Sequence, residues 1–87
     1  MEKPGQDLID TGIRDLADGV ESVEALLVSI GAPRLSRLGM RVPATLSEPE
    51  TRLYELLAAD DADSAHSRYN ALVRRLVSYE RAAECAS

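Results

Sequence analysis

The chain has 87 residues, a formal net charge of −5 and an apolar content of 45%, with neither Phe nor Trp. This apolar content excludes a disordered chain, and the length predicts one domain, residues 1–87, with a modest core. The longest unbroken apolar run covers residues 25–28, which excludes a membrane-spanning segment because such a segment needs ~20 residues. The N-terminal residues lack the apolar stretch of a secretion signal, and a lone cysteine, Cys85, favours a reduced cytoplasmic setting.

An apolar stripe with alternating steps of four and three residues opens the chain. Its members are Ile9, Ile13, Leu16, Val20, Val23, Leu27 and Ile30. This spacing keeps one side of a helix apolar, so it predicts a long helix over residues 6–30 that packs against another helix. Gly31 and Pro33 follow directly and predict where that helix ends.

Gly12 and Gly19 lie inside this predicted helix, and each costs about 1 kcal/mol relative to Ala in a helix interior. Two arrangements fit: one continuous helix, or a break at Gly19 followed by a new helix with Ser22 as its N-cap. We favour the continuous helix, because the stripe keeps its phase across both glycines. Both glycines lie beside the stripe, where they either admit a neighbouring backbone at close range or are simply tolerated on a half-exposed flank.

Two shorter helices are predicted in the middle of the chain. Residues 33–38 can form a short helical segment that Gly39 would end. After an extended connector, Ser47 can cap a helix whose first turn tolerates Pro49. The apolar residues that follow predict a helix over residues 48–59.

A second stripe with the same spacing closes the chain, and its members are Ala65, Tyr69, Leu72, Leu76, Tyr79 and Ala83. It predicts a second long helix over residues 64–84, with an apolar face broad enough to contact more than one neighbour. The predicted fold class is therefore all-α, a small helical bundle. We expect its two long heptad-patterned helices to pack as an antiparallel pair that the shorter helices cover.

Charge alternates in sign along the chain. Residues 1–24 and 48–63 are predominantly acidic, whereas residues 25–47 and 64–87 are predominantly basic. We expect these blocks to neutralise one another after folding.

Glu80 falls inside the apolar arc of the last predicted helix, where a buried carboxylate would need a partner. The acid-free stretch of the chain supplies Arg34, Arg37 and Arg41. We predict that Arg37 pairs with Glu80, because Arg37 is the central arginine of the three. The other interpretation is that the last helical turn exposes Glu80 to solvent.

Residue patterns typical of catalysis or metal binding are not evident. His66 lies beside serines and aspartates, but neighbours on one helical turn point in different directions and do not converge as a catalytic triad does. Asp60, Asp61 and Asp63 do not match a calcium loop, which also needs a Gly at its sixth and a Glu at its twelfth position. They fit an acidic helix start instead. We therefore expect no catalytic residue, no cofactor and no metal.

The sequence thus favours a non-enzymatic protein-interaction module, a small cytoplasmic adaptor or regulatory subunit that acts through a helical face. With two stripes and few large core residues, the chain is also expected to form a homodimer. The alternative is a small nucleic-acid-associated regulator that contacts phosphates through the block of Arg34, Arg37 and Arg41. Against it, an acidic protein repels phosphate and residues 33–38 are short for a recognition helix. The candidate interaction residues are Arg34, Arg37, Arg41, Arg68, Arg75 and Glu80.

Overall fold

The computed structural model describes residues 3–86, which form four helices and no strand. The helices are α1 (Gln6–Ala17), α2 (Val23–Arg37), α3 (Pro49–Asp60) and α4 (Ala65–Ala86). The all-α fold class is therefore confirmed. The predicted helices over residues 48–59 and 64–84 are confirmed as α3 and α4, whose bounds lie within two residues of the prediction.

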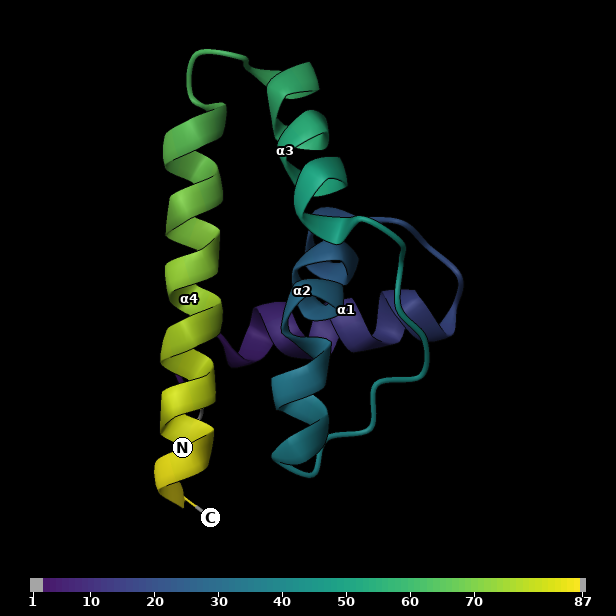
Figure 1. Cartoon of the computed structure of the whole chain (residues 1–87), viewed down its shortest axis with the longest axis vertical. Coiled ribbons are helices and arrows are strands. Elements are labelled where there is room, and N and C mark those ends of the chain that lie inside the picture. The colour runs from purple at the N-terminus through teal and green to yellow at the C-terminus, as the bar shows by residue number, and fades with distance from the viewer. Residues whose placement is uncertain (1–2, 87) are drawn as a thin grey trace.

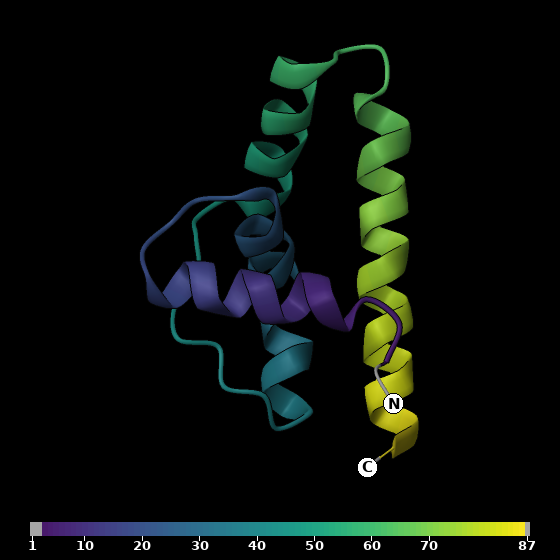
Figure 2. The same cartoon turned by 180° about the vertical axis from the view of Figure 1, so that it is seen from behind.

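α2 is the central helix of the bundle. It packs on α1, α3 and α4, and its residues 25–29 are all buried. α1 lies across α2, and α3 runs back alongside α4 to form a helical hairpin (Figure 1 and Figure 2). The end of this hairpin, around the connection at residues 61–64, extends beyond α1 and α2 in both views.

The prediction of one continuous helix over residues 6–30 is wrong, because the chain breaks between α1 and α2. Gly19 has a φ of 73°, a left-handed conformation that glycine adopts at little cost and that commonly ends a helix. Ser22 then caps α2, since its hydroxyl oxygen accepts a hydrogen bond from the Ala25 N–H at 3.1 Å. The same hydroxyl donates to the Asp15 carboxylate at 2.6 Å and so ties the new helix to α1.

The break allows α1 to fold back directly onto α2 at Gly12. In one straight helix, residues 12 and 28 would lie ~24 Å apart. In the structure, a Cβ built on Gly12 would overlap the carbonyl oxygen of Glu24 and the Cγ2 of Val28. Close approach of a neighbouring backbone is therefore confirmed for Gly12, and that backbone belongs to α2. Gly19 has no atom near enough to make such a contact.

α2 continues through Gly31 and Pro33, where an end was predicted, and it includes the separate short helix predicted over residues 33–38. Both expectations are wrong because Gly31 is a packing residue: a Cβ there would lie only 2.8 Å from a methyl group of Leu76 in α4. The helix ends at Arg37 instead, and Gly39 follows its C-cap residue with a left-handed φ of 92°, the conformation that commonly terminates a helix. The predicted role of Gly39 is thus confirmed.

The predicted antiparallel packing of the two long helical segments is also wrong, because α2 and α4 run in the same direction (Figure 1). Val23, at the start of α2, shares a hollow with Leu72 of α4. Arg34, near the end of α2, contacts Glu84 near the end of α4. The physical reason is α3, which runs opposite to both: the chain reverses between α2 and α3 and again between α3 and α4, so α2 and α4 point the same way (Figure 1).

Buried apolar side chains from all four helices form one cluster. Its larger members are Ile9, Leu16, Leu26, Leu27, Val28, Leu35, Leu53, Leu57, Leu76 and Tyr79. Most residues of the two predicted stripes are buried or half-buried, as expected. Val20 is the exception, with 47% of its surface exposed, because the break places it in the α1–α2 loop.

Candidate binding groove

The structure does not gather the candidate interaction residues into one patch. It places them at three locations: Arg34 and Glu80 between α2 and α4, Arg68 and Arg75 on one edge of α4, and Arg37 and Arg41 near the end of α2. The two arginines near the end of α2 are exposed.

Glu80 is buried in the contact between α2 and α4, with only 4% of its surface exposed. Its carboxylate lies 3.6 Å from the Arg34 guanidinium, which also forms a 2.6 Å bond to Glu84. The prediction of a buried Glu80 paired with an arginine of α2 is confirmed. The choice of Arg37 is wrong: Arg34 lies on the α4 side of α2, one turn after Gly31, whereas Arg37 is exposed.

The environment of Glu80 changes its proton affinity. Burial raises the pKa of the Glu80 carboxyl above its ordinary value of 4.5, and the positive charge of Arg34 opposes this shift only in part. The pKa of Arg34 is raised too, chiefly by its hydrogen bond to Glu84. Arg34 therefore remains charged, and the arginine block proposed for phosphate contacts loses one member to an internal ion pair.

We predict that Glu80 makes the protein less stable as the pH rises above about 4.5. The folded-state pKa is raised, so the folded protein holds a proton that the unfolded chain has already released. The free energy of unfolding contributed by this group falls through that window and levels off above the raised pKa. Denaturant unfolding at a series of pH values should show this slope in the wild type and its loss in Glu80→Gln. Glu55→Gln, which removes an exposed carboxylate, is the control, and an unchanged slope in Glu80→Gln contradicts the prediction.

A groove lies between α3 and α4, beside the first residue of α2. We call it the α3–α4 groove, and it is lined by Val23, Leu57, Arg68, Ala71, Leu72 and Arg75. It encloses about 270 Å³. Leu57 is fully buried at its base, while Val23 and Leu72 are half-buried and present apolar surface to solvent.

Two arginines border the α3–α4 groove on α4. Arg68 and Arg75 are seven residues apart, so they lie on the same side of the helix, ~10 Å apart along its axis. Arg68 bonds to Asp60 at the end of α3 at 2.8 Å, and Arg75 contacts Asp7 of α1 at 3.4 Å. These pairs join acidic stretches of the chain to its last basic stretch, as the alternating charges predicted.

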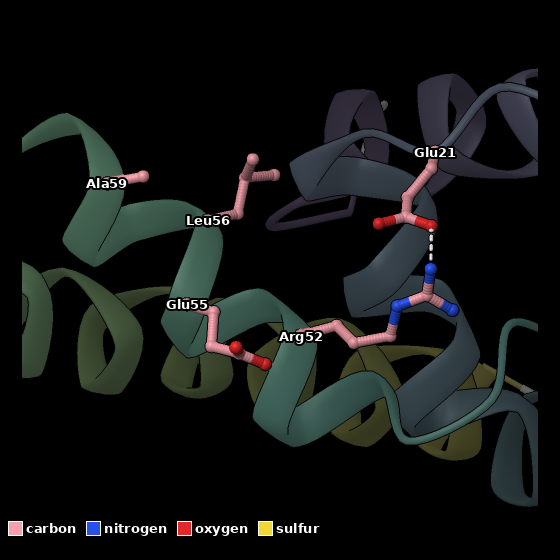
Figure 3. A pocket seen from close by; sticks show the side chains of 5 residues that line it. All are labelled: Glu21, Arg52, Glu55, Leu56 and Ala59. Atoms are coloured by element: carbon pink, nitrogen blue, oxygen red, sulfur yellow. Dashed lines mark hydrogen bonds and ion pairs between the residues drawn. The ribbon is translucent and has the colours of Figure 1, made fainter.

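A second hollow, of about 330 Å³, lies on the other flank of α3. It is lined by Glu21, Arg52, Glu55, Leu56 and Ala59, and Figure 3 shows Arg52 reaching across it to Glu21. The Arg52–Glu21 distance is 2.5 Å. Three of its five lining residues are charged, against two of six in the α3–α4 groove, so this hollow is the more polar of the two.

The sequence indicated parts of the α3–α4 groove but not the groove itself. Arg68 and Arg75 were candidates, and Leu72 belonged to the second stripe. Val23, Leu57 and Ala71 were missed as site residues, because they come from three different helices and the sequence pattern of one helix does not show which residues of another lie beside it. The sequence feature that could have indicated the groove was the broad apolar face of α4, because such a wide face leaves one edge half-exposed.

The residues considered for catalysis and metal binding are placed as surface residues. His66 and Asn70 lie 3.2 Å apart on successive turns of α4, and the Asp61 carboxylate accepts a hydrogen bond from the Asp63 N–H at 3.1 Å. Within residues 3–86, no cluster of three or more His, Cys, Asp or Glu side chains could hold a metal ion, and no helix is long and apolar enough to cross a membrane. Comparisons with protein family models, with curated proteins and with solved structures found no match to this chain.

Proposed function

We propose that this protein is a non-enzymatic protein-interaction module, a small cytoplasmic adaptor or regulatory subunit, and that it binds its partner in the α3–α4 groove. The observation that carries the proposal is the half-buried apolar floor between two arginines. An apolar centre with a polar border is the usual composition of a protein interface. At about 270 Å³, the groove is smaller than the ~300–1,000 Å³ of typical small-molecule sites, and it suits a few side chains of a partner protein.

Blocking the groove tests this function. Ala71 is exposed and lines the groove, so Ala71→Trp should fill the groove without disturbing the buried cluster. Ser78→Trp is the matched control, because Ser78 is exposed on the same helix, seven residues further on and outside the groove. Wild type and both variants would be used to capture proteins from the native host, followed by mass spectrometry.

The proposal expects a protein that the wild type and Ser78→Trp retain and that Ala71→Trp loses. Identical sets of captured proteins for all three chains contradict it. A salt-dependent shift of duplex DNA, lost on replacing Arg37 and Arg41, would instead favour the nucleic-acid alternative.

Self-association is a separate prediction of the two stripes. Light scattering at micromolar concentration should give about twice the chain mass. Most side chains of the two stripes are buried or half-buried within one chain. Any dimer must therefore form through exposed residues such as Val20, Tyr54 and Leu56. The chain mass alone at high concentration contradicts the prediction.

A further inference from the structure

The side chains that line the α3–α4 groove indicate which kind of partner fits it. This inference rests on the proposed function, that the groove binds a protein. Along one edge of α4, the order is Arg68, then Ala71 and Leu72, then Arg75. The two cations are therefore two helical turns apart, and apolar surface lies between them. Arginine is the side chain best suited to binding carboxylates, because its planar guanidinium offers five N–H donors.

Both arginines retain capacity for a partner. Within residues 3–86, Arg68 pairs with Asp60 and Arg75 pairs with Asp7, and both of these aspartates are strongly exposed. Exposed pairs of this kind contribute little to stability, so an incoming carboxylate can share or displace them at little cost. Asp60 and Asp7 thus occupy the positions that acidic groups of a partner would take.

We propose that the α3–α4 groove binds an acidic amphipathic helix of another protein. This helix carries two acidic residues seven positions apart, to meet Arg68 and Arg75, and apolar residues at the third and fourth positions after the first acid, to fill the groove. Helices docked in grooves present their anchors at this spacing.

A second copy of this chain does not fit the pattern. Glu48 and Glu55 are the one pair of acidic residues seven positions apart in the sequence, and the residues between them on that face are Thr51 and Arg52. These are polar, so they cannot fill an apolar groove. The charge and apolar surface of the groove therefore favour a different protein as the occupant.

Synthetic helices test the proposal directly. The probe is an alanine-rich, fluorescently labelled peptide of ~18 residues, long enough to be helical, with Glu at the two acidic positions and Leu at the two apolar positions. One comparison peptide has Lys in place of Glu, and another has Ala in place of Leu. Fluorescence anisotropy would measure binding to the full chain. The acidic leucine peptide should bind at least about tenfold more tightly than either comparison peptide.

Variants of the protein assign the binding to the groove. Arg68→Gln with Arg75→Gln should weaken binding of the acidic peptide by at least about fivefold. Arg74→Gln with Arg81→Gln makes the same charge change on the solvent face of α4 and should leave binding within about twofold. Asp60→Asn should strengthen binding, because it frees Arg68 from its internal partner. Circular dichroism would confirm that each variant keeps its helices.

Three results overturn the proposal: no binding of the acidic peptide at millimolar protein, equal binding of the lysine peptide, or equal losses in the two arginine double variants. These results are separable from failure of the proposed function. If the peptide fails while Ala71→Trp still loses a captured protein, the groove binds a partner of different chemistry. If Ala71→Trp loses no captured protein, the proposed function itself fails.

Discussion

Gly12→Ala is expected to destabilise the protein by about 2–3 kcal/mol, a large part of the stability of a domain of this size. The added methyl group would overlap the Glu24 carbonyl oxygen and the Val28 side chain, so α1 must move away from α2. The overlap with a backbone atom cannot be relieved by a change of rotamer. The gain of ~1 kcal/mol in helix propensity offsets only part of this cost. Guanidinium unfolding followed by circular dichroism would measure the difference.

Gly19→Ala separates this steric effect from a conformational one. Gly19 has open space around it, but its left-handed φ of 73° is unfavourable for alanine. Its cost should be about 1 kcal/mol, the strain of one non-glycine residue in that conformation. A Gly12→Ala variant as stable as the wild type would show that α1 and α2 are not in close contact.

Leu76→Ala is expected to destabilise the protein by about 2–5 kcal/mol, which is enough to unfold much of a marginally stable population. Leu76 is 3% exposed and packs against Gly31 of α2. Its truncation removes apolar contacts and leaves a cavity that a glycine-lined wall cannot fill. Unfolding in denaturant, with an unchanged slope of free energy against denaturant concentration, would establish the loss.

Leu56→Ala makes the same chemical change at a site that is 40% exposed. It should cost less than about 1 kcal/mol, because surface truncations away from the core have small effects. Equal losses in the two leucine variants would contradict the placement of Leu76 in the core.

The periodicity of apolar residues predicted the fold class and the buried face of α4, because packing dictates that pattern. It did not predict the break near Gly19, since two separate helices can preserve the same phase by packing on one core. Ser22 carried the correct signal as a helix cap, and the phase argument outweighed it. Gly31 was wrongly predicted to end a helix, because glycine occurs both at helix ends and where two helices touch. Only its contact with Leu76 of α4 distinguishes the two roles.

Glu80 was predictable as a buried charge, because its position among apolar residues of one helix depends on that helix alone. Its partner was harder to predict, since the choice between Arg34 and Arg37 depends on which side of α2 faces α4. The α3–α4 groove is harder still to predict from the sequence, because residues of three helices form it. The direction of α2 relative to α4 decides which of these residues meet.

The order of the helices also has a consequence for how the chain folds. α1 contacts α2, α2 contacts α3, and α3 contacts α4, so most helix packing joins neighbours along the chain. Such local topologies have low contact order and fold within microseconds to milliseconds. The parallel contact between α2 and α4 is the principal non-local one. It can form only after α3 has turned the chain back, so we expect it, with the burial of Glu80, to complete folding rather than to start it.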